Sequence, residues 1–347
     1  MKTILIVIIL ISNILFASSI KHKEPQSAVV FMYHHFANSK YPSTNITLEQ
    51  FQYQLDYLEI NNYNVWPLSK IVNHIIEKKT IPKKTIALTI DDAYLSVFTQ
   101  AYPMLKSKKF PFTVFVSTNS IHNRSSNFMS WEQMRIMKTN GAQFANHSST
   151  HTSLLPQKNE TNIELKTRII EEIQRAQLKL QKELGSDTNI NPPLFSYPFG
   201  EYNIEITELI KKLGYIGVTQ TSGAIGIDSD LKVLSRFPMA EAFATTKGFI
   251  TKLNTLPMPI ESISKKEPII KDENPPKLRI ILKQALKNMG CYLSNGDTIK
   301  IKWISKIELE VTANSPIKSP REKYTCTAPA KDGKWYWYSH LWIINKY

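Results

Sequence analysis

The sequence predicts an α/β fold in which a mainly parallel sheet is covered by helices on both faces. Two observations support this: near-continuous apolar runs recur along the chain, and helical periods separate them. The runs that we expect to be strands span 28–33, 85–90, 112–117, 142–146, 194–199 and 215–219. This pattern fits an open sheet or one closed into a barrel.

Two of the intervening helices carry clear end signals. Thr161 and Glu164 have the spacing of a capping box, and Gly185 stands where that helix should stop. Asn203 is a cap for a second helix, which Gly214 ends.

The first nineteen residues resemble a secretory signal peptide. Lys2 precedes an apolar run over 4–16, and the small residues 17–19 follow it. We therefore expect a bacterial protein that is secreted or periplasmic, without a membrane span after cleavage. A retained membrane anchor is the alternative.

Domain boundaries follow from composition. A first domain is expected over 20–255, a proline-rich linker over 256–276 and a small β-rich domain over 277–347. Residues 278–289 fit a short helix or a strand, and Asn295-Gly296 and Asp332-Gly333 indicate hairpin turns. The aromatic run 335–342 could stack on sugar rings or pack into a core.

Composition excludes some classes of function. Of the 347 residues, 42% are hydrophobic and 21% charged, as in globular proteins rather than disordered ones. The net charge of +14 is spread along the chain, so we expect no nucleic-acid partner. We expect a monomer, with peripheral attraction to anionic surfaces as one option. Cys291 and Cys326 are either a disulfide or two buried thiols.

Polar residues gather where the expected strands end. Asp91 and Asp92 follow the second run, and His147 and His151, four residues apart, follow the fourth. Strand ends of a parallel sheet share one edge, where such sites form. Two imidazoles and one carboxylate are a metal-ligand set with open positions, and the second aspartate would be free to act as a base.

Three motifs, "LTIDDAY", "HSSTH" and "YPFGEYN", resemble in order and spacing those of polysaccharide deacetylases, the carbohydrate esterase group with the NodB-homology domain. The similarity covers roughly 28–238 and is greatest to the branch acting on poly-N-acetylglucosamine. It implies a distorted (β/α) barrel and metal-dependent removal of acetyl groups from N-acetylated sugars.

The resemblance also implies residue roles. Asp92, His147 and His151 would bind a divalent metal, zinc above all, and Asp91 would be the general base. The amide of Phe199 would stabilise the oxyanion, with Tyr197 and Pro198 beside it at the substrate. His34 would be the acid for the leaving amine, with His35 as its rival.

Three positions depart from the family pattern. Ala93 replaces a glycine, Ile90 replaces a phenylalanine, and Ser196 replaces the arginine that would pair with the base. The sequence therefore predicts that this charge partner is missing.

The function expected is an exported, metal-dependent deacetylase of a glycan that contains N-acetylglucosamine. An inactive glycan-binding protein on the same scaffold and an O-acetyl esterase are the alternatives.

Overall fold

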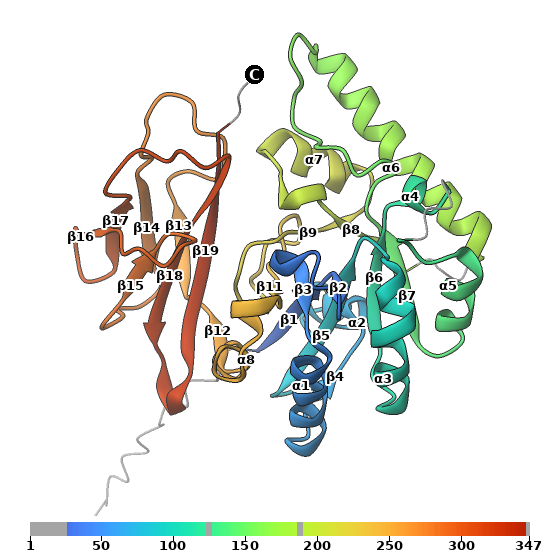
Figure 1. The fold of residues 1–347 in the computed structure, drawn as a ribbon. Helices are drawn as coiled ribbons and strands as arrows, with labels where there is room; N and C mark the ends of the chain where they lie inside the picture. The colour runs from blue at the N-terminus through green and yellow to red at the C-terminus, as the bar shows by residue number, and fades with distance from the viewer. Residues whose placement is uncertain (1–25, 123–126, 186–189, 345–347) are drawn as a thin grey trace, which may run out of the picture.

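The computed structural model describes residues 26–122, 127–185 and 190–344, so the expected signal peptide lies outside the described residues. Figure 1 shows an α/β part, drawn from blue to yellow, beside a β part drawn in orange and red. Within the described ranges, no helix has the length and apolar character needed to cross a membrane.

The α/β part is built on one curled sheet, the half-barrel expected for a distorted (β/α) barrel (Figure 1). Its strands, as far as the chain is described, are β1 (Ser27–Tyr33), β4 (Asn64–Val65), β5 (Thr85–Asp91), β6 (Phe112–Val116), β7 (Ala142–Asn146), β8 (Leu194–Ser196), β9 (Ile216–Val218), β10 (Ile225–Gly226) and β11 (Phe237–Pro238). The order is β10-β1-β5-β6-β7-β8-β9, with β11 beside β1 and β4 beside β5. All pairs except β1 with β10 are parallel.

Helices and short segments connect these strands. The helices are α1 (Leu48–Ile60), α2 (Leu68–Ile76), α3 (Tyr102–Ser107), α4 (Thr118–His122), α5 (Trp131–Lys138), α6 (Asn162–Leu184), α7 (Ile204–Lys212) and α8 (Thr246–Leu253). A π-helical turn, Val97–Ala101, leads into α3, and the short strands β2 (His35–Phe36) and β3 (Asn45–Ile46) pair with each other. The expected caps are confirmed: Thr161 and Glu164 form the capping box of α6, and Asn203 caps α7.

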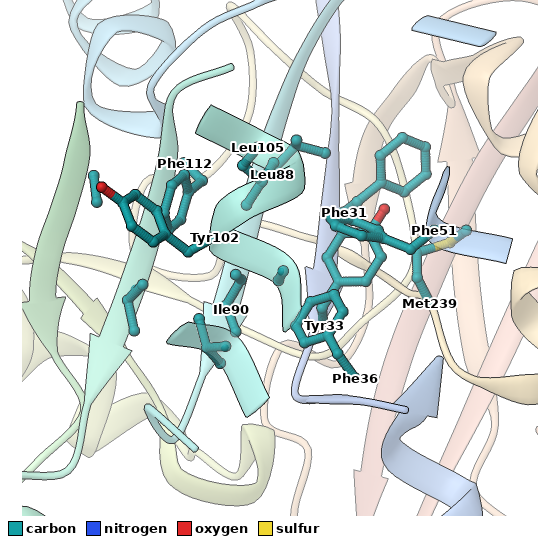
Figure 2. Close-up of a cluster of buried hydrophobic side chains, with 14 of the residues drawn as sticks. Phe31, Tyr33, Phe36, Phe51, Leu88, Ile90, Tyr102, Leu105, Phe112 and Met239 are labelled. Carbon is teal, nitrogen blue, oxygen red and sulfur yellow. The ribbon is translucent and has the colours of Figure 1, made fainter. Parts of the chain in front are cut away.

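The core lies on both faces of the sheet, as the continuous apolar strands predict. On β1, Phe31 and Tyr33 pack toward α1 and α8, whereas Val30 points to the other face. Figure 2 shows Phe31, Tyr33, Phe36 and Phe51 gathered around the end of β1. The Tyr33 hydroxyl donates to Gln54 Oε1 at 2.7 Å, which satisfies a wholly buried polar group. This packing fixes the position of the residues that follow β1.

The β part consists of two four-stranded sheets in the described chain. One has the order β12 (Thr255–Pro257), β19 (Trp335–Ile343), β18 (Arg321–Pro329) and β15 (Gly290–Tyr292); the other has the order β13 (Ile260–Ile263), β14 (Leu278–Leu282), β17 (Glu308–Thr312) and β16 (Lys300–Trp303). Cys291 and Cys326 lie opposite each other on β15 and β18 and form a disulfide, which decides between the two alternatives. Residues 278–282 are a strand rather than a helix.

The range 256–276 is more structured than a linker. It contains most of β12 and all of β13, so the stretch expected to be a linker includes two strands. Both strands are sheet edges, where proline removes no ladder hydrogen bond that the sheet requires. Edge strands can therefore form in a stretch whose proline content suggests none. The domain boundaries themselves stay a prediction.

The aromatic run 335–342 mainly joins the two parts. Trp337 packs edge-on against Phe237 at 5.3 Å, and Trp342 is buried within the β part. Trp335, which is 38% exposed, is left at the surface. The run therefore serves packing more than an open sugar-stacking platform.

One buried titratable residue of β19 makes stability depend on pH. Burial lowers the pKa of His340 to about 3, and its Nε2 has no hydrogen-bond partner in the described structure. Between about pH 6.5 and that value the unfolded chain binds a proton that the folded chain excludes, so stability falls as pH falls, by about 1.4 kcal/mol per unit. We expect a His340→Gln variant to lose less stability than the wild type between pH 7 and 5. Urea unfolding at several pH values measures this, and parallel pH curves would contradict it.

Candidate active site at the carboxyl edge of the sheet

Three potential metal ligands converge at the ends of β5 and β7. Asp92 Oδ1 lies 3.4 Å from His147 Nε2 and 3.3 Å from His151 Nε2. One ligand atom from each residue lies within 4.8 Å of the others. The His147 Nδ1 donates to the Ser196 carbonyl at 2.7 Å, so Nε2 keeps its lone pair for a cation. Two imidazoles and one carboxylate on an open edge fit a zinc-type ion.

A buried glutamate holds the loop that carries the two histidines. Glu172 on α6 accepts hydrogen bonds from the Ser149 amide at 3.1 Å and from the Thr150 amide at 2.8 Å. Ser148 and His151 have left-handed backbones, with φ of 64° and 59°. This strained turn needs such anchoring, and a charged residue within the apolar stripe of α6 is the sequence signal by which Glu172 could have been found.

Asp91, unlike Asp92, points into the protein and is fully buried. Arg236 forms a bidentate ion pair with it: Nη1 lies 2.7 Å from Oδ1 and Nη2 lies 2.8 Å from Oδ2. Ser196 Oγ donates to Asp91 Oδ2 at 3.3 Å and accepts from Arg236 Nη2 at 2.9 Å. The Asp91 carboxylate and the Arg236 guanidinium therefore neutralise each other's charge and satisfy much of each other's hydrogen-bonding capacity inside the core.

The prediction that the charge partner of Asp91 is missing is wrong. Arg236, one residue before β11, occupies that role, and the serine at 196 leaves room for its guanidinium. The available signal was a lone arginine in the apolar stretch 233–240, but nothing local connects it with Asp91.

The charges around the two aspartates keep both ionised. Burial alone would raise the pKa of Asp91, but the Arg236 guanidinium outweighs it and lowers that pKa below the ordinary value. For Asp92, burial also raises the pKa, whereas the hydrogen bond and charge of His147 lower it further than burial raises it. Both groups can thus accept a proton or a cation at neutral pH.

A cleft of about 430 Å³ opens at Asp92 and His151, with His147 buried behind them. Its lining includes His34, Asp92, Tyr94, Phe128, His151, Phe199, Gln220 and Arg321. His34 thus faces the cleft, whereas His35 is buried between the rings of Tyr41 and Tyr94, at 4.5 and 3.6 Å. Burial lowers the pKa of His35 to about 4, which leaves it neutral.

The third motif contributes one residue to the cleft. Phe199 lines it with a left-handed backbone (φ 59°), and its ring meets the ring of His151 edge-on at 4.6 Å. Tyr197 and Pro198 do not appear in the lining; Tyr197 is wholly buried and its hydroxyl donates to the Lys232 carbonyl at 2.9 Å. These two residues support the turn from beneath.

Ala93, which stands where the family pattern has a glycine, lies in a turn with a left-handed backbone. Asp92 and Ala93 have φ values of 72° and 57°, which glycine adopts at less cost. The turn after β5 is therefore strained, yet it directs the Asp92 carboxylate into the cleft while Asp91 faces inward.

Residues 78–218 match the family model described as "Polysaccharide deacetylase". The match includes all three motifs and supports a relationship to the polysaccharide deacetylases over this part of the chain. The family match and the names of the relatives support a hydrolase of the polysaccharide N-deacetylase class. The family expected from the three motifs is confirmed.

Individual relatives are distant. YxkH of Bacillus subtilis (strain 168) is 25% identical over 221 residues, which are 62% of this chain and 73% of that protein. A protein of Escherichia coli (strain K12) named "Poly-beta-1,6-N-acetyl-D-glucosamine N-deacetylase" is 25% identical over 193 residues, 47% of this chain. The match spans only 29% of that relative's length.

A solved structure shows the same fold. The deacetylase PplD of Streptococcus pyogenes, in complex with acetate, superposes with a TM-score of 0.58 at 22% identity, over 66% of this chain and 99% of that one. The likeness supports the distorted barrel.

The buried ion pair leads to a stability prediction. Replacing Arg236 by Met leaves the Asp91 carboxylate without its cation, and such a loss costs about 3 to 5 kcal/mol. We expect the double variant Asp91→Asn, Arg236→Met to be more stable than Arg236→Met alone, because it removes the unpaired charge as well. Chemical denaturation measures both; equal stability of the single variant and the wild type would contradict the role of the pair.

Proposed function

We propose that this protein is an exported, metal-dependent deacetylase that removes N-acetyl groups from a polymer or oligosaccharide containing N-acetylglucosamine. The observation that carries the proposal is the Asp92, His147 and His151 donor set, of which Asp92 and His151 line an open cleft. The ionised Asp91 is buried next to this set and interacts with the charge of His147. The name of the Escherichia coli relative supports a poly-N-acetylglucosamine substrate.

Asp92, His147 and His151 would hold the metal, for which zinc is the best candidate. A bound zinc ion polarises an acetyl carbonyl and acidifies a water molecule. The remaining tasks fall to groups of the chain: taking the proton from water, stabilising the oxyanion, and protonating the leaving nitrogen.

Asp91 is proposed as the general base. Oδ2 accepts hydrogen bonds from both Arg236 and Ser196, whereas Oδ1 accepts one from Arg236, so a lone pair of Oδ1 can still accept a proton. The water oxygen bonds to the acetyl carbon as its proton passes to Asp91, and the Phe199 amide would donate to the resulting oxyanion. His34 then protonates the nitrogen as the carbon–nitrogen bond breaks, which yields acetate and a free amine. His34 is preferred to His35 because it faces the cleft.

The cleft suits a sugar. Tyr94, Phe128 and Phe199 offer aromatic surface on which pyranose rings can pack, and the open edge admits a chain that extends beyond one residue. Export is supported by the apolar segment 4–16 and by the Cys291–Cys326 disulfide, which requires an oxidising compartment.

Metal content and acetate release test this function directly. We expect wild-type protein loaded with zinc to release acetate and free amine in equal amounts from oligomers of N-acetylglucosamine. Asp92→Asn should lose the metal and the activity together. His34→Gln should keep the metal and lose about 10²- to 10⁴-fold in kcat, the usual contribution of an acid catalyst.

His74→Gln, which changes a histidine on α2 away from the cleft lining, is the matched control and should retain full activity. Acetate release from an O-acetylated glycan but not from the N-acetylglucosamine oligomers would identify an esterase instead. A folded, zinc-loaded protein that releases no acetate from either N-acetylated or O-acetylated glycans would leave only the binding-scaffold alternative.

A further inference from the structure

Strand β18 of the β part presents alternate side chains to the two sides of its sheet. Tyr324 and Cys326 belong to the buried core of the β part. Arg321 and Lys323 therefore point the opposite way, toward the deacetylase domain. Both reach residues that line the cleft.

Arg321 makes three contacts with the turn that contains Phe199. Its Nη1 donates to the Phe199 carbonyl at 3.1 Å, and its guanidinium lies over the Phe199 ring, 5.4 Å from the centroid. Its Nε lies 3.7 Å from Glu201 Oε1, a carboxylate that is itself largely buried. Arg321 thereby contacts both the backbone and the side chain of Phe199.

Lys323 contacts Gln220, which belongs to a second segment of the cleft lining. Its Nζ donates to the Gln220 carbonyl at 3.3 Å, and Gln220 also lines the cleft. The segments that contain Phe199 and Gln220 are in close contact. A Cβ added at Gly200 would lie only 2.8 Å from the Gln220 Cβ. Strand β18 is thus attached to both segments that form this side of the cleft.

Phe199 requires such support. A left-handed backbone is costly for a residue with a side chain, and neighbouring groups must impose it. The orientation of its peptide determines where its amide points, and its ring is packed against the potential ligand His151. A small rotation of this turn would misdirect the amide.

We propose that Arg321 is a positioning residue for deacetylation, by which the C-terminal β part completes the active site instead of serving as a separate sugar-binding module. The proposal rests on the proposed function and on the role of the Phe199 amide within it. Arg321 acts through Phe199, so its loss should lower kcat more than it raises KM.

The test compares Arg321→Ala, Arg321→Lys and the control Arg279→Ala. Arg279 is an exposed arginine of β14 that pairs with Glu308, so the control removes the same charge far from the cleft lining. We expect Arg321→Ala to lower kcat about tenfold to a hundredfold with zinc content unchanged, as the loss of a charge-assisted hydrogen bond implies. Arg321→Lys, which keeps a donor and a charge, should recover much of that loss, and Arg279→Ala should match the wild type.

Hydrogen exchange of the folded protein provides a readout that needs no turnover. In Arg321→Ala, amides of 199–202 should exchange at least several-fold faster than in the wild type and in Arg279→Ala. Unchanged exchange would overturn the positioning role whether or not the wild type is active. A raised KM with kcat unchanged would overturn it in favour of direct contact with substrate. Absence of wild-type activity combined with faster exchange would refute the proposed function alone.

Discussion

The ion pair between Asp91 and Arg236 is the interaction on which the rest of the site depends. An isolated carboxylate inside the core would be too costly to remain ionised, so the inward-facing half of the Asp-Asp pair requires a cation. Arg236 supplies it with two hydrogen bonds and donates through Nε to the Thr219 carbonyl at 3.0 Å. The segments around β5, β8, β9 and β11 are thereby fixed relative to one another. The outward-facing Asp92 can then meet the two histidines.

Five residues at the same edge have strained backbones. Asp92, Ala93, Ser148, His151 and Phe199 all have left-handed backbones without being glycine. Each such residue costs about 1 to 2 kcal/mol, and the cost is maintained by buried contacts from neighbouring elements. Glu172 anchors the histidine loop, and Arg321 anchors the Phe199 turn. These strained conformations lower the stability of the fold, but they orient the side chains and the Phe199 amide toward the cleft.

The sequence predicts the parts of this arrangement that depend on local pattern. Apolar runs identify the strands, caps delimit α6 and α7, and topology alone suggests that residues after β5 and β7 meet. Arg236 escaped prediction because it lies 145 residues from Asp91, and only tertiary packing makes them neighbours. The strands β12 and β13 escaped for another reason: proline is tolerated at a sheet edge, so composition there resembles that of a linker. Arg321 gave no signal, since an arginine that begins a strand is ordinary.

The central claim is that Asp92, His147 and His151 form a metal site within a catalytic cleft. Anomalous diffraction at the zinc absorption edge, from crystals of the protein loaded with one equivalent of zinc, tests it most directly. Our account predicts a single strong peak within coordination distance of Asp92, His147 Nε2 and His151 Nε2, and its absence in crystals of Asp92→Asn. A zinc peak elsewhere, or none at this edge of the sheet, would contradict the account.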